Sequence, residues 1–119
     1  MKKTVVLGAS TNPARYSYLA INKLVANNHP VVAIGRKEGM VADIDFLIGT
    51  PQIEDVDTVT LYLNPTNQQP YYDYILSLHP KRVIFNPGTE NDELIALLEK
   101  EGIQAQEACT LVLLGTGQY

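Results

Sequence analysis

A glycine-led segment near the start of the chain carries groups suited to binding an anion. Gly8 directly follows the apolar run Thr4 to Leu7, and hydroxyl groups follow at Ser10 and Thr11. If that run is a strand and a helix begins after the segment, Gly8 permits a tight turn and the helix start offers unpaired backbone N–H groups. Such groups, with the helix dipole, favour a phosphate. An ordinary capped turn without a ligand is the alternative, because Ser10 and Pro13 replace the second and third glycines of the dinucleotide-binding fingerprint.

Three basic side chains accompany this segment. Arg15 lies within it, and Arg36 and Lys37 follow the second apolar run. NAD-binding domains usually carry an acidic residue at that second position, where it holds the ribose hydroxyls. A cation there suits a phosphate on the ribose instead, as in NADP or in the 3′-phosphate of coenzyme A (CoA), and Arg15 is placed to face a pyrophosphate. The alternative is that Arg36 and Lys37 form a solvated surface pair.

Apolar periodicity predicts the elements that position these groups. Short runs bounded by turn residues predict strands buried on both faces of a parallel sheet, at Thr4 to Leu7, Pro30 to Ile34, Val56 to Leu63, Arg82 to Phe85 and Ile103 to Ala108. Helical spacing predicts helices at Tyr18 to Asn27, Asn67 to Leu78 and Asn91 to Glu101. The alternation indicates one α/β domain over residues 1–119, a three-layer Rossmann-like fold with a parallel sheet of about five strands and helices on both faces. The stretch Lys37 to Asp55 is irregular, with a short strand expected at Phe46 to Ile48 after a helical turn.

In such a sheet, ligands bind beyond the carboxyl ends of the strands. Both histidines, His29 and His79, fall in turns at the opposite edge. Cys109 follows the last strand at the expected ligand edge, either as a contact to a thiol or thioester or as a small buried apolar residue. No nucleophile with a neighbouring base is recognisable, so no catalytic residue is predicted. The candidate ligand-binding residues are Gly8, Ala9, Ser10, Asn12, Arg15, Tyr16, Ser17, Gly35, Arg36, Asn64, Asn86, Pro87, Gly88 and Cys109.

Composition excludes several classes of protein. The formal net charge of -4 gives no general attraction for polyanions, which argues against a nucleic-acid or anionic-membrane binder. One cysteine and two histidines provide no zinc-ligand set. No apolar run reaches the roughly 20 residues of a membrane span, and the opening run is too short for the core of a signal peptide. A cytoplasmic location is therefore expected.

The first loop resembles that of the stand-alone CoA-binding domain family, whose pattern G-A-S-x-x-P-x-R-x-S-Y is matched by Gly8, Ala9, Ser10, Pro13, Arg15, Ser17 and Tyr18. The resemblance extends through the segments 86–91 and 108–112. These domains are similar to the nucleotide-binding part of the succinyl-CoA synthetase α subunit. The resemblance implies a Rossmann fold that holds the ADP portion of CoA, with the matched loop on the phosphates and Arg36 facing the 3′-phosphate. It also implies that Asn64, Asn86 and Gly88 approach the ligand from neighbouring loops.

Two departures from the family pattern concern the ends of the ligand. The second strand of related members often ends in Pro-x-Asn-Pro, where this chain has the segment 33–36, and the later motif is commonly more hydrophobic than Asn86-Pro87-Gly88. The main hypothesis is a non-catalytic module that binds CoA or an acyl-CoA. The alternatives are an NADP-dependent oxidoreductase and a ligand-free interaction domain. In the latter, the apolar tail from Leu111 to Tyr119 closes a homodimer or contacts another protein.

Overall fold

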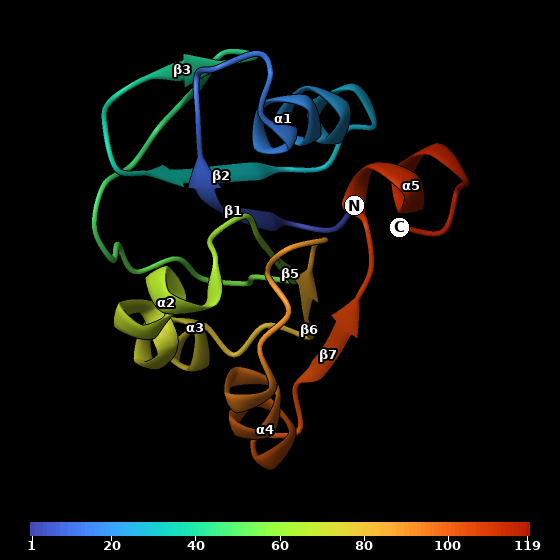
Figure 1. Cartoon of the computed structure of the whole chain (residues 1–119). Helices are drawn as coiled ribbons and strands as arrows, with labels where there is room; N and C mark the ends of the chain where they lie inside the picture. Colours follow the sequence, from blue (N-terminus) through green and yellow to red (C-terminus); the bar gives the residue numbers. More distant parts are fainter.

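In the computed structural model, which describes residues 1–119, five parallel strands form one sheet in the order β2-β1-β5-β6-β7 (Figure 1). Register pairs such as Val5 with Val32 and Val59 hold β1 between its neighbours. The chain leaves β1 toward β2 on one side and later returns to β5 on the other. The boundary between β1 and β5 is therefore the switch point, where sheets of this kind bind ligands. The strands are β1 (Thr4–Ala9), β2 (Val31–Gly35), β5 (Thr58–Leu61), β6 (Arg82–Phe85) and β7 (Gln104–Glu107).

Helices cover both faces of the sheet, which confirms the three-layer prediction. Figure 1 shows α1 (Tyr16–Ala26) and α5 (Thr110–Gly115) on one side of the strands. On the other side lie α2 (Pro65–Gln68), the 3-10 turn η1 (Gln69–Tyr71), α3 (Tyr72–Ser77) and α4 (Asp92–Lys100). Two apolar cores follow from the alternation of side chains along each strand, because Val5 and Leu7 face α3 and α4 while Val6 faces α1 and α5. No helix combines the length and apolar character needed to cross a bilayer.

The predicted helix at 67–78 is divided into α2, η1 and α3. Pro70 lies within η1 and has no backbone N–H, so it cannot donate the hydrogen bond that would continue a single helix. The first piece begins two residues earlier than predicted because the Asn64 side chain accepts a hydrogen bond from the Asn67 N–H at 2.9 Å and Pro65 occupies the first helical position. The buried apolar residues of α3 still face the core as the spacing indicated.

The segment between β2 and β5 differs from its prediction. The expected helical turn is wrong, since β3 (Met40–Val41) and β4 (Ile44–Asp45) form an antiparallel hairpin. Ala42 and Asp43 have φ values of 51° and 63°, which is the left-handed backbone of a tight hairpin turn and is incompatible with a right-handed helix. In place of a strand at Phe46 to Ile48, a single parallel bridge joins Leu47 to Ile34 at the edge of β2.

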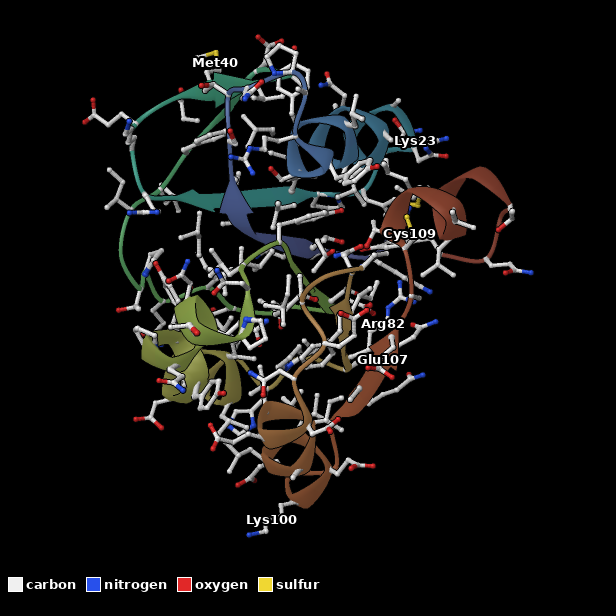
Figure 2. All side chains as sticks on the ribbon, viewed as in Figure 1. Lys23, Met40, Arg82, Lys100, Glu107 and Cys109 are labelled. Atoms are coloured by element: carbon white, nitrogen blue, oxygen red, sulfur yellow. The ribbon has the colours of Figure 1, made fainter.

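The apolar tail folds onto its own chain. Leu113, Leu114 and Tyr119 are buried, the two leucines against α1 and the neighbouring strands. These three side chains pack within the chain, whereas Val112 of the same tail is 58% exposed, and the tail as an interface stays a prediction. Figure 2 shows α5 beside α1, with Cys109 at its start.

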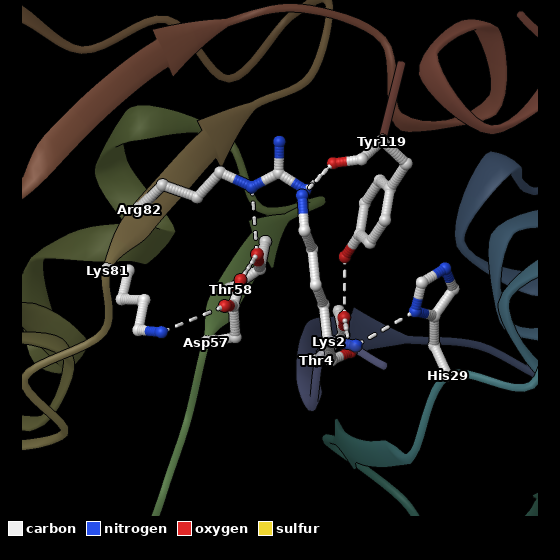
Figure 3. Close-up of polar contacts among 8 residues, drawn as sticks. All are labelled: Lys2, Thr4, His29, Asp57, Thr58, Lys81, Arg82 and Tyr119. Atoms are coloured by element: carbon white, nitrogen blue, oxygen red, sulfur yellow. Dashed lines mark hydrogen bonds and ion pairs between the residues drawn. The ribbon is translucent and has the colours of Figure 1, made fainter. Parts of the chain in front are cut away.

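Tyr119 reaches the amino edge of the sheet, where the strands begin. Its hydroxyl hydrogen-bonds the Thr4 hydroxyl, and the guanidinium of Arg82 lies 4.4 Å from its ring centroid (Figure 3). Arg82 is buried, donating to Thr58 Oγ1 and to the Tyr119 carbonyl oxygen, both at 2.8 Å. The His29 ring also lies against Tyr119, with centroids 4.9 Å apart. This cluster fixes the tail on the edge opposite the predicted site.

Candidate functional site

A groove of about 950 Å³ lies at the carboxyl ends of β1, β2, β5 and β6. It is the position that the topology favours for a ligand, because it spans the switch point between β1 and β5. Eleven of the fourteen candidate residues line it: Gly8, Ala9, Ser10, Asn12, Arg15, Tyr16, Ser17, Arg36, Asn64, Pro87 and Gly88. The residues that the sequence placed at separate strand ends are therefore gathered in one concave surface.

The other three candidates lie behind or beside the groove. Gly35 is buried under it, where an added Cβ would lie 3.1 Å from the Ala9 carbonyl oxygen. Asn86 is also buried, and its side chain is engaged within the protein: Nδ2 donates to Thr60 Oγ1 and Leu61 O, and Oδ1 accepts from the Thr110 N–H. Cys109 is half-buried at the N-cap of α5 and does not line the groove.

The loop after β1 is held close to β5. Gly8 has a φ of 100°, and an added Cβ would lie 3.1 Å from both the Tyr62 carbonyl carbon and Leu63 Cδ2. A side chain at this position would therefore combine backbone strain with a steric conflict. Beyond Gly8, Asn12 closes the loop on itself, because its N–H donates to Ser10 Oγ and its Oδ1 accepts from the Ala14 N–H. The loop and β5 together form the floor of the groove.

The start of α1 leaves donors for a ligand. Its N-cap residue, Arg15, makes no side-chain capping bond, and the backbone N–H groups of Tyr16, Ser17 and Tyr18 have no acceptor in the chain. Ser17 is 3% exposed, yet its hydroxyl also makes no internal hydrogen bond. Ser17 lines the groove, and its hydroxyl is not a fully buried atom, since the one fully buried side-chain polar atom without a partner is Tyr62 Oη. The Ser17 hydroxyl therefore reaches the groove. Unpaired donors at a helix N-terminus fit a phosphate group.

Charge on the groove is positive although the chain is acidic. Arg15, Arg36 and Lys37 line it and are exposed, and none is in an ion pair, since the single salt bridge joins Lys81 to Asp57 at 3.9 Å. One carboxylate, Glu38, lines the same side. Three cations against one carboxylate make this a local site for an anion in a protein of net charge -4.

The opposite side of the groove is uncharged. The loops after β5 and β6 contribute to it, with Tyr62, Leu63, Asn64, Asn67, Pro87, Gly88 and Thr89 in the lining. Burial raises the pKa of Tyr62 to about 12, while the neighbouring Thr60 and Thr110 act in the opposite direction. Its phenol therefore remains protonated at neutral pH, and this side offers amides and apolar surface to a ligand.

The sequence analysis did not identify Phe46, Tyr62 or Asn67 as part of the groove. Phe46 comes from the irregular segment and packs beside Gly35 and Gly39, an arrangement that only the hairpin fold produces. Tyr62 was recognisable, because it continues the alternation of β5 one residue past the strand end. Asn67 was hidden by the prediction of a helix that starts at that residue.

Comparison with known families identifies the family to which the chain belongs. A family model described as "CoA binding domain" matches residues 2–115. The chain belongs to this CoA-binding domain family. The match confirms the resemblance found in the first loop and gives no support to the NADP alternative.

Solved structures share the architecture of this CoA-binding domain. The crystal structure of an uncharacterized protein is 52% identical with a TM-score of 0.97, and the match covers 100% of this chain and 98% of that one. A conserved hypothetical protein from Pyrococcus furiosus has a TM-score of 0.81 at 23% identity, with 94% and 98% coverage. A Thermus thermophilus structure has a TM-score of 0.87 at 19% identity, with 99% and 90% coverage. The last two show the fold alone, and no protein with a curated description matches the sequence.

Proposed function

We propose that this domain binds CoA or an acyl-CoA through the ADP portion in the groove, as a non-catalytic module. The observation that carries the proposal is the meeting of the unpaired N–H groups of α1 with three unpaired cations at the switch point of the sheet. Backbone donors and cations at one place suit a diphosphate. Membership of the CoA-binding domain family supports CoA as the diphosphate in question.

The cations divide between two phosphate positions. Arg15 and Ser17 belong to the start of α1, so they are assigned to the pyrophosphate. Arg36 and Lys37 follow β2, the strand beside β1, and are assigned to the 3′-phosphate of the ribose. This division predicts that the two ends of the nucleotide are recognised independently.

A non-catalytic role is supported by the chemistry of the lining. No histidine or cysteine lines the groove, and its one carboxylate is that of Glu38. His29 and His79 precede β2 and β6 at the amino edge, away from the groove. No group of three or more His, Cys, Asp or Glu side chains is arranged as metal ligands.

Calorimetric titration with CoA, dephospho-CoA and NADPH tests the proposal. We expect CoA to bind more tightly than dephospho-CoA by about 1.5 to 3 kcal/mol, the range for hydrogen bonds to a charged group. In Arg36→Ala this preference should largely disappear, whereas Arg15→Ala should weaken both ligands by a similar amount. Lys100→Ala is the control, since Lys100 ends α4 on the far side of the molecule (Figure 2).

Three results would contradict the proposal at different levels. No binding of CoA at millimolar concentration would remove it. Equal affinity for CoA and dephospho-CoA would remove the assignment of Arg36 to the 3′-phosphate. Tighter binding of NADPH than of CoA would replace the ligand while keeping the phosphate site.

A further inference from the structure

Gln68, at the end of α2, joins two loops that line the groove. Its Nε2 donates to Leu63 O and to Thr89 O, both at 2.8 Å. Leu63 belongs to the loop after β5 and Thr89 to the loop after β6, and both residues line the groove. The Gln68 side chain itself is 0% exposed and lies behind this surface. One carboxamide therefore sets the spacing of two neighbouring loops.

The bonds of Gln68 are all directed into the protein. Its Oε1 accepts from Asn91 Nδ2 at 2.9 Å, so both amide hydrogens and the carbonyl oxygen are used. Asn91 also donates to the Tyr72 hydroxyl and caps α4 through Oδ1, which accepts from the Glu93 and Leu94 N–H groups. The two loops are thereby tied to α3 and α4. A buried polar network that is fully satisfied holds one geometry, whereas a partly satisfied one is costly.

The side of the groove held in this way is the uncharged one. The cations Arg15, Arg36 and Lys37 all come from the loops after β1 and β2. A ligand whose phosphates lie against those cations must place its uncharged arm along the loops after β5 and β6. That arm is the pantetheine of CoA, whose amides match the hydrogen-bonding capacity of Asn64 and Asn67.

We propose that Gln68 is a positioning residue that fixes the wall against which the uncharged arm of the ligand lies. The inference rests on the proposed function and extends it from the nucleotide to the rest of CoA. Gln68 does not touch the ligand. It acts by keeping Leu63 and Thr89 at a fixed separation.

The test measures two ligands on three forms of the full chain by calorimetry. The ligands are CoA and 3′-phosphoadenosine 5′-diphosphate, which is CoA without its pantetheine arm. The forms are the unaltered chain, Gln68→Met, which keeps side-chain length without the hydrogen bonds, and Gln69→Met, the same change at the exposed neighbouring residue outside the groove. We expect Gln68→Met to weaken CoA about tenfold, the scale of one lost hydrogen bond, and to leave the fragment within about twofold. Gln69→Met should change neither affinity.

A second variant and a ligand-free measurement cover the case in which Gln68→Met does not fold. Asn91→Ser keeps a good N-cap for α4 but removes the bond to Gln68, so it should weaken CoA selectively by a smaller factor. In either variant, amide hydrogen exchange of the Thr89 N–H, which donates to Asn86 O at 2.9 Å, should become faster.

The outcomes separate this proposal from the proposed function. Equal weakening of CoA and the fragment would show a general loss of the site and overturn the positioning role. Unchanged CoA affinity in folded Gln68→Met would overturn it as well, while CoA binding by the unaltered chain still stood. No binding of either ligand to the unaltered chain would overturn the proposed function and this inference with it.

Discussion

Replacement of Asn86 by Ala tests whether this residue holds the protein together or contacts the ligand. The side chain is 3% exposed and connects β5, β6 and the start of α5 through three hydrogen bonds of 2.7 to 2.9 Å. Its own carbonyl oxygen accepts from both the N–H and the hydroxyl of Thr89, which closes the turn that presents Gly88 to the groove. We expect Asn86→Ala to lower stability far more than a surface substitution does.

The magnitude follows from the groups left without partners. Thr60 Oγ1 keeps its hydrogen bond to Thr110 Oγ1 at 2.8 Å, so losing the bond from Asn86 costs this hydroxyl little free energy. The Thr110 N–H and the Leu61 carbonyl oxygen lose the Asn86 side chain and stay buried. At about 1 to 3 kcal/mol for each orphaned group, the free energy of unfolding falls by about 2 to 6 kcal/mol. A domain of this size is stable by about 5 to 15 kcal/mol, and roughly 4 °C accompanies each kcal/mol, so the melting temperature should drop by at least about 8 °C.

Thermal and urea unfolding followed by circular dichroism measure the effect. Asn22→Ala is the matched control, because Asn22 is exposed on α1 and its side chain donates to the Tyr18 carbonyl oxygen within the same helix. CoA titration of the same variants completes the assay. A melting temperature within about 3 °C of the unaltered chain, together with a large loss of CoA affinity, would refute the reasoning and return Asn86 to the ligand contacts.

Two further predictions concern backbone strain and pH. Gly8→Ala should lower the free energy of unfolding in urea by about 1 to 3 kcal/mol more than Gly102→Ala does. Both glycines have positive φ, but an added Cβ at Gly102 meets open space whereas one at Gly8 meets Tyr62 and Leu63. Equal losses of stability in the two variants would contradict the close approach of Gly8 to the residues after β5. The pKa of His29 lies below its usual value of 6.5, because desolvation, the N-terminal ammonium, Lys2 and Arg82 lower it more than Asp57 raises it. The unfolded chain therefore binds a proton on His29 more readily than the folded chain does. Stability should therefore be intact above about pH 6.5 and fall below it, and the fall should be smaller in His29→Gln, whose amide oxygen can still accept from the Lys2 N–H.

The inner strands β1, β5 and β6 were predictable because burial on both faces leaves a direct record in the sequence, whereas the edge strand β7 is exposed or half-buried along its length and does not show the predicted burial. Val5, Val6 and Leu7 are all apolar since successive side chains of β1 enter opposite cores, and the same holds along β6. The strand ends then placed most of the groove residues, because parallel strands bring their carboxyl ends to one edge. The limits of single elements were less predictable where a local feature, such as Pro70, interrupts a regular apolar pattern.

The remaining features depend on contacts between distant residues, which a local pattern does not record. Asn86 has the residue type of a ligand contact, yet its partners Thr60, Leu61 and Thr110 are 24 to 26 residues away and occupy the whole side chain. Glutamine is a residue type found mostly on protein surfaces, yet Gln68 is fully buried. The fold also supplies a surface on α1 for Leu113 and Leu114 of the tail, which no local pattern indicates.

Lys2 and Tyr119 touch at the amino edge of the sheet, on the side away from the groove (Figure 3). A circular permutant should therefore fold. In it a short linker joins these residues, new ends open at the exposed turn around Gly49, and every strand keeps its neighbours in the sheet. For the same reason, a sensor chip or a fluorescent label attached next to either residue faces away from incoming cofactor, which makes this edge the natural point of immobilisation for the titrations described above.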